Sequence, residues 1–132
     1  MKLPELRRQL RAVASPERAA ILQRFFKTGP GEYGEGDAFL GARVPDVRRL
    51  VKQTDRLGLA DIRTLLHSRW HEERLLALLI LVRRFERGDE QAQGRLYRLY
   101  LRSTAFINNW DLVDCSAPPI VGAWLLERPR SI

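Results

Sequence analysis

Eight consecutive apolar residues, 75–82, constrain the fold of this 132-residue chain more than any other feature. They lie within a helical pattern that runs from 70 to about 87 and ends at Gly88. A helix that is apolar all round must be covered by other elements on several sides. No segment shows the sustained two-residue alternation of a strand, so we expect an all-α protein.

Helical patterns elsewhere bring the expected number of helices to about seven. Ser15 supplies a cap for the helix expected at 16–27, and Pro16 supplies its first-turn proline. Pro118 and Pro119 should kink or split the last helix. The expected ranges are 4–13, 16–27, 45–53, 59–66, 70–87, 90–103 and a helix capped by Asn109 that resumes at 120–126.

Two stretches of the sequence weakly echo each other. Leu-Leu-His-Ser at 65–68, followed by Trp70, resembles Tyr-Leu-Arg-Ser at 100–103, followed by Trp110. The offset is 35 residues before the turn and 40 after it, which is the period of HEAT-like helix pairs. We therefore expect residues 1–132 to form a single HEAT-like helical-repeat domain.

The charge balance favours a polyanionic partner. Lysine and arginine number 23 against 16 acidic residues, and 20 of the 23 are arginine. Arginine forks match phosphate geometry and stack on bases, so we expect nucleic acid. Solvated helix faces are the alternative that composition leaves open.

Several features point to the cytoplasm. Cys115 is the single cysteine, which excludes an intramolecular disulfide and fits a reducing compartment. The N-terminal residues lack the apolar core of a signal peptide. The run 75–82 is too short to cross a bilayer, so no membrane partner is expected.

Basic residues recur in rows with helical spacing. Parallel helices could bring these rows into one groove that follows a phosphate backbone, or each row could be a separate solvated face. The rows comprise Arg48, Arg49, Lys52 and Arg56; Arg83, Arg84 and Arg87; and Arg95, Arg98 and Arg102. The residues that we expect to contact nucleic acid are Arg48, Arg49, Lys52, Arg83 and Arg84.

Two motifs resemble known sites but are better explained otherwise. Gly29, Gly31 and Gly34 have the dinucleotide-binding spacing, yet no strand precedes them and nearby acids would repel a pyrophosphate. We expect that loop to be a connector in which Tyr33 and Phe39 pack or contact a ligand.

His67 and His71 have a spacing that can hold a metal, but Ser68 stands where the metalloprotease pattern needs glutamate. Solvated or capping roles are commoner for such histidines. With the glycine loop also discounted, we expect neither a nucleotide cofactor nor a bound metal.

An acidic and aromatic patch is predicted on the helix that Asn109 caps. Trp110 and Asp114 are neighbours at i,i+4, and Asp111 and Asp114 at i,i+3. Asp111 lies in the first turn, where the helix dipole favours a carboxylate for structural reasons alone. Asp114 lies further in, so it is either a buried acid paired with an arginine or a site residue.

These residues resemble the site helix of the AlkD-type DNA alkylation repair family. The resemblance rests on three segments: 110–114 with Pro118 and Gly122, 33–41 with Arg-Val-Pro at 43–45, and 71–78. It runs from about Phe25 to the C-terminus. The family consists of HEAT-like repeats and includes glycosylases that remove cationic N3- and N7-alkylated purines from double-stranded DNA.

The resemblance implies a role for each residue of the patch. Asp114 matches the catalytic aspartate and would stabilise the oxocarbenium ion of the sugar. Trp110 would pack on the deoxyribose, and Asp111 would support the helix start or assist the water. Family members continue through further repeats, so we expect this chain to be the N-terminal portion of the domain and to self-associate through an uncapped end.

Two other functions stay open at this point. A non-catalytic DNA-binding or damage-sensing protein would bind DNA tightly without releasing a base. A protein-interaction scaffold would have its arginine rows scattered over several faces.

Overall fold

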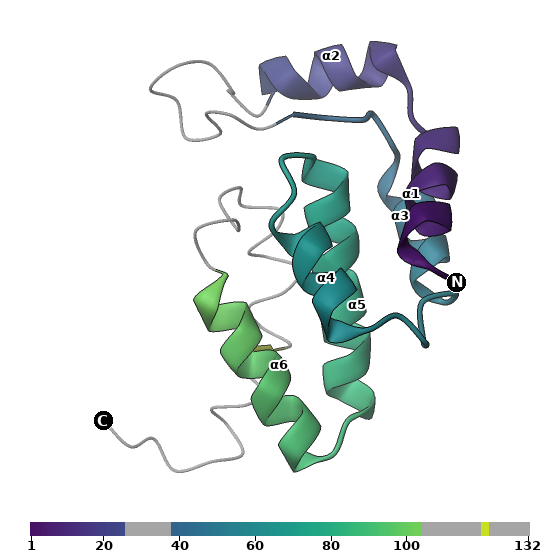
Figure 1. Ribbon diagram of the computed structural model, residues 1–132. Helices are drawn as coiled ribbons and strands as arrows, with labels where there is room; N and C mark the ends of the chain where they lie inside the picture. Colours follow the sequence, from purple (N-terminus) through teal and green to yellow (C-terminus); the bar gives the residue numbers. More distant parts are fainter. Residues whose placement is uncertain (26–37, 104–119, 122–132) are drawn as a thin grey trace.

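The computed structural model describes residues 1–25, 38–103 and 120–121, and the elements in this part are helices (Figure 1). A single bridge between Ala38 and Trp70 is the one strand-like pairing among these residues. The prediction of an all-α protein is confirmed. The helices are α1 (Leu3–Ala12), α2 (Pro16–Phe25), α3 (Val44–Val51), α4 (Leu59–Leu66), α5 (His71–Arg87) and α6 (Glu90–Arg102).

Helix α5 is the centre of the packing. It contacts α3, α4 and α6, while α1 packs on α3 (Figure 1). Leu76, Leu78 and Ile80 are completely buried, and all the remaining residues of α5 from His71 to Leu81 are buried as well. Each such leucine or isoleucine contributes about 1.5–3 kcal/mol when removed from water. The apolar run at 75–82 is thus covered on several sides, as predicted.

The helix bounds follow the sequence signals closely. The range predicted for α4 agrees with the structure, and the described ends of the others agree or differ by at most two residues. Trp70 was expected inside the fifth helix but is extended, because it pairs with Ala38 and precedes the first helical turn. The end of the second predicted helix and the Asn109-capped helix fall outside the described residues, although Ile120 lies fully buried in the core.

The two echoing stretches meet in space. The Nε2 atom of His67, at the end of α4, lies 3.1 Å from the Oγ atom of Ser103, at the end of α6. Ser103 is completely buried. The helices that carry the repeat therefore end side by side, as expected when one helical repeat stacks on the next.

Two buried acids at the start of α5 hold the N-terminal part of the chain. Glu73 is completely buried and its carboxylate lies 3.1 Å from Arg7 and 3.2 Å from Arg11, both on α1. Glu72 accepts hydrogen bonds from the backbone of residues 40–42. No helix among the described residues has the length and hydropathy needed to span a membrane.

Candidate nucleic-acid interface

A hollow between α3 and α5 brings together three of the five residues predicted to contact nucleic acid. Arg48 reaches it from α3, Lys52 from the residue that follows α3, and Arg83 from α5. The hollow measures about 400 Å³, and Glu86 is the one acidic residue among the described residues that line it. Arg48 and Lys52 form no ion pair with another described residue. Their charges are therefore available for an external anion.

Arg49, the fourth predicted residue, is on α3 but does not line this hollow. Its guanidinium pairs with Asp46 one turn earlier, and its side chain is 73% exposed. Exposed pairs at this spacing contribute at most a few tenths of a kcal/mol. The pair leaves the Arg49 side chain accessible from solvent.

Arg84, the fifth, lies deeper in the protein. Its guanidinium donates to the carbonyl oxygens of Thr54, at 2.7 Å, and Leu57. Burial lowers the pKa of Arg84, and the nearby Asp55 partly opposes this effect. Through these two hydrogen bonds Arg84 stabilises the loop between α3 and α4. A phosphate contact by this residue stays a prediction.

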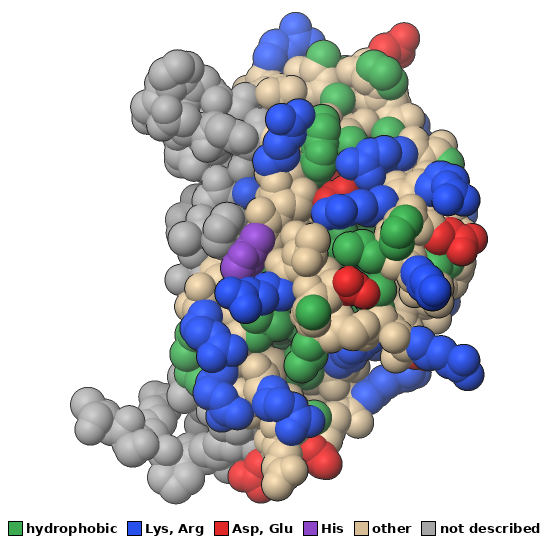
Figure 2. Space-filling model, in the orientation of Figure 1, with side chains coloured by type: hydrophobic (Ala, Val, Ile, Leu, Met, Phe, Trp, Pro, Cys, Tyr) green, Lys and Arg blue, Asp and Glu red, His purple; other side chains and the backbone are tan. Residues whose placement is uncertain are grey.

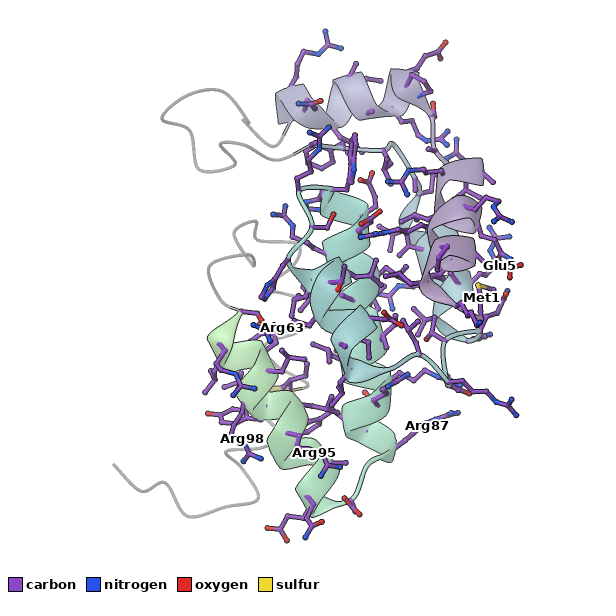
Figure 3. All side chains as sticks on the ribbon, in the orientation of Figure 1. Met1, Glu5, Arg63, Arg87, Arg95 and Arg98 are labelled. Carbon is purple, nitrogen blue, oxygen red and sulfur yellow. The ribbon has the colours of Figure 1, made fainter. Side chains whose placement is uncertain are left out.

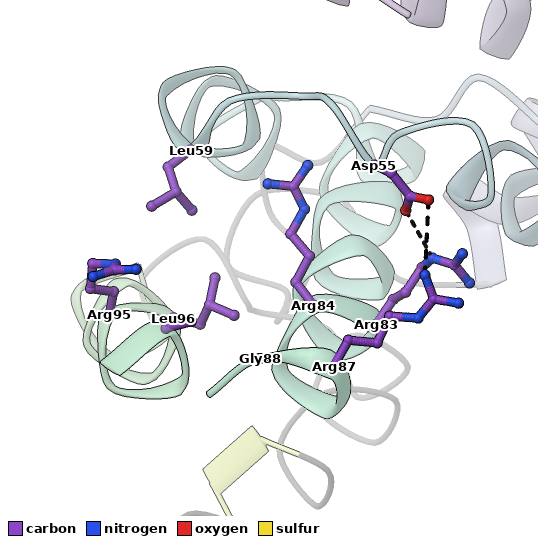
Figure 4. Close-up of a pocket in the computed structure, with 9 residues that line it drawn as sticks. Asp55, Leu59, Arg83, Arg84, Arg87, Gly88, Arg95 and Leu96 are labelled. Carbon is purple, nitrogen blue, oxygen red and sulfur yellow. Dashed lines mark hydrogen bonds and ion pairs between the residues drawn. The ribbon is translucent and has the colours of Figure 1, made fainter. Parts of the chain in front are cut away.

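Asp55 neutralises part of the basic surface, and no motif in the sequence indicates this role. Its carboxylate lies 3.2 Å from Arg83 and 3.9 Å from Arg87 at the C-terminal end of α5 (Figure 4). The hydrogen bond from Arg83 lowers the pKa of Asp55, and the charges of the neighbouring arginines act in the same direction. Its signal in the sequence is weak, because Asp55 is 28 residues from Arg83.

The residues of the basic rows line a series of adjoining hollows rather than one groove. A second hollow, of about 540 Å³, lies between α5 and α6 and shares Arg83 with the first (Figure 4). A third, of about 360 Å³, lies between α4 and α6 and shares Arg95 with the second. Nine cationic and two acidic side chains line the three together. The surface is therefore strongly positive.

Arg63 is a further basic residue that the sequence analysis did not single out. It lines the third hollow with the predicted row Arg95, Arg98 and Arg102. Arg63 is the one arginine of α4 and belongs to no row of its own. Its proximity to α6 follows from helix packing alone.

The remaining motifs separate into packed residues and residues outside the described ranges. Phe39 is buried and stacks on His71 with 4.6 Å between ring centroids. Of its two predicted roles, packing and contact with a ligand, the structure shows packing. His67 contacts Ser103 instead of joining His71 at a shared site. The proposed catalytic residues Trp110, Asp111 and Asp114 lie outside the described residues, as do Cys115, Tyr33 and the glycine fingerprint.

These features define a class: an all-helical protein with a strongly basic surface of consecutive hollows. The sequence matches the family model described as "DNA alkylation repair enzyme" over residues 6–132. The chain therefore belongs to the DNA alkylation repair enzyme family. No curated protein and no solved structure matches it significantly.

Proposed function

We propose that this protein is a DNA glycosylase that hydrolyses the N-glycosidic bond of cationic N3- or N7-alkylated purines in double-stranded DNA. The observation that carries the proposal is the family match over residues 6–132, which includes the whole segment 110–114. The positive surface formed by α3, α5 and α6 supports it, because a duplex is a dense polyanion. We further propose that residues 1–132 form a single HEAT-like domain.

The chemistry that we propose needs one carboxylate and one aromatic ring. The alkylated purine is already cationic, so it leaves with the electron pair of its bond to C1′ and becomes neutral. Positive charge then develops on the sugar, where the carboxylate of Asp114 stabilises it. Water adds to C1′ and loses a proton toward this carboxylate. The face of Trp110 packs on the sugar and adds a cation–π interaction, and Asp111 supports the helix start or assists the water.

The basic surface would hold the duplex by its phosphates. Arg48, Lys52 and Arg83 are our proposed contacts in the α3–α5 hollow, because the structure brings these three together. Contacts of this kind set affinity and orientation but carry no sequence information. They suit an enzyme that must find a rare lesion in any sequence.

The decisive experiment is the release of 7-methylguanine from methylated duplex DNA. We expect wild type to release the base and Asp114→Asn to lose about 10²-fold or more of the rate. Duplex affinity should be unchanged, because Asn keeps the shape of the side chain. Asp61→Asn, a carboxylate-to-amide change in the first turn of α4, is the matched control and should release base like wild type.

Two results would contradict the proposal in different ways. A folded wild-type chain that binds duplex DNA tightly but releases no base would identify a damage-sensing protein. A chain whose binding is insensitive to salt would identify a protein-interaction scaffold, since phosphate contacts require a steep loss of affinity with salt.

A further inference from the structure

Among the residues that the structure describes, the groove between α4 and α6 is lined by arginine and leucine alone. Its residues are Leu59, Arg63, Arg95, Arg98, Leu99 and Arg102. We call this surface the arginine groove. All four arginines are exposed, and Lys and Arg side chains gather over the face that carries α4 and α6 (Figure 2). Figure 3 shows Arg63, Arg95 and Arg98 along α6 and the neighbouring part of α4.

No acidic side chain among the described residues lines this groove, although Glu90 lines a neighbouring hollow with Arg95 and Arg98. None of the four arginine side chains forms an ion pair or hydrogen bond with a described residue. Some arginines elsewhere are paired, such as Arg83 with Asp55 and Arg7 with Glu73, whereas Arg48 is unpaired among the described residues like the four of the groove. Four like charges held together repel one another unless an anion lies among them. The arginine groove therefore fits an external polyanion.

The spacing of the row on α6 suits a phosphate backbone. Arg95, Arg98 and Arg102 follow one another at three and four residues, so they lie on one face of the helix. They extend over about 10 Å at the helical rise of about 1.5 Å per residue. A DNA strand carries one phosphate per about 3.4 Å of duplex axis. The row therefore spans about three phosphates, and guanidinium forks bind phosphate oxygens in pairs.

We propose that the arginine groove is a second phosphate-binding surface, which holds DNA outside the α3–α5 hollow. The inference rests on the proposed function for the identity of the polyanion. DNA is favoured over an acidic protein because the hollows adjoin: the α5–α6 hollow shares Arg83 with the α3–α5 hollow and Arg95 with the groove. The basic surface thus continues around the end of α5 toward α6.

The test is a salt titration of duplex binding by the full chain, with undamaged DNA so that no catalysis is required. We expect Arg98→Gln/Arg102→Gln to weaken binding and to reduce the slope of log K against log salt by about 1.8, or about 0.9 for each lost contact. Arg98→Lys/Arg102→Lys should keep most of the slope, because the charges remain. Since these side chains are exposed, thermal unfolding should match wild type.

The matched control is Arg8→Gln/Arg24→Gln, which removes the same charge from exposed positions on α1 and α2 that line none of the three hollows. A slope change in the groove variant no larger than in this control would overturn the inference. So would a variant that loses binding to anionic phosphatidylserine vesicles but keeps duplex binding.

A third variant separates this inference from the proposed function. If Arg48→Gln/Lys52→Gln loses duplex binding and the groove variant does not, the arginine groove is not a DNA surface and the proposed function stands. If folded wild type binds no duplex, both proposals fail.

Discussion

The carboxylate of Glu72 accepts a hydrogen bond from the backbone amide of Gly41 at 2.8 Å. The amides of Leu40 and Ala42, on either side of Gly41, donate to the same carboxylate. Three consecutive donors stabilise a charge that is almost entirely buried. Arg18 of α2 donates from Nε to the carbonyl oxygen of Gly41 at 2.8 Å. One residue on α5 thereby positions the backbone of residues 40–42, just before α3.

Gly41→Ala should destabilise the protein strongly. Gly41 has a φ of 81°, and a Cβ atom there would lie 2.0 Å from the carbonyl oxygen of Ser15. The left-handed conformation alone costs about 1–3 kcal/mol for a residue with a side chain, and the contact with backbone adds to it. Urea denaturation measures the loss. Gly58→Ala is the control and should change the free energy of unfolding by less than about 1 kcal/mol, since nothing lies within 4 Å of its Cβ position.

Removing the cations that pair with Glu73 should lower the stability of the protein more than removing Glu73 itself. Removing both cations with Arg7→Gln/Arg11→Gln leaves a buried charge uncompensated, which should cost about 3 kcal/mol or more. Glu73→Gln should cost less, because the arginine side chains are 35% and 44% exposed and keep access to water. Thermal unfolding of the two variants checks the order. Arg8→Gln on the same helix is the control, and an equal loss in both variants would contradict this account.

Arg83 and Arg84 are adjacent on α5 but should have different roles. We expect Arg83 to bind DNA and Arg84 to stabilise the fold. Arg84→Gln removes the donor to the carbonyls of Thr54 and Leu57, so it should lower stability by about 2 kcal/mol. Arg83→Gln breaks only an exposed pair with Asp55, so it should lower stability much less than Arg84→Gln does. It should instead reduce the salt slope of duplex binding by about 0.9. The same titration on Arg84→Gln tests whether that residue contacts phosphate.

Asp55→Asn should strengthen duplex binding. The substitution removes the acidic partner of Arg83, which we already propose as a phosphate contact, and releases Arg87. The salt slope should become steeper by up to about 0.9 when Arg87 gains a phosphate. Fluorescence anisotropy measures the change, and Asp61→Asn is the control. Weaker binding by Asp55→Asn would show that the pair orients Arg83 for its contact.

The same residue predicts a pH dependence. Because Arg83 lowers the pKa of Asp55 in the folded state, the pair stabilises the protein above the pKa of the unfolded chain, about 3.9. This stabilisation is lost as the pH falls from there through the lower folded value. The free energy of unfolding of Asp55→Asn should not show this loss at acid pH. Identical pH profiles of stability for wild type and variant would contradict the prediction.

Local sequence patterns predicted most of the helices. The run 75–82 indicated a covered central helix, and proline and glycine placed several helix ends within one or two residues. These signals are readable because the helical period and caps depend on residues within one or two turns. Because these signals are local, the sequence shows each row of arginines. It does not show which rows lie close together in the fold.

The amino-acid sequence by itself determined that this protein is helical, that α5 is its buried centre and that its surface carries an excess of arginine. Only the tertiary structure decided that Arg63 joins the row on α6, that Asp55 holds Arg83, and that Glu72 binds the backbone around Gly41. Each of these relationships joins residues about 30 apart in the sequence. Their proximity depends on how whole helices pack, which no local spacing encodes.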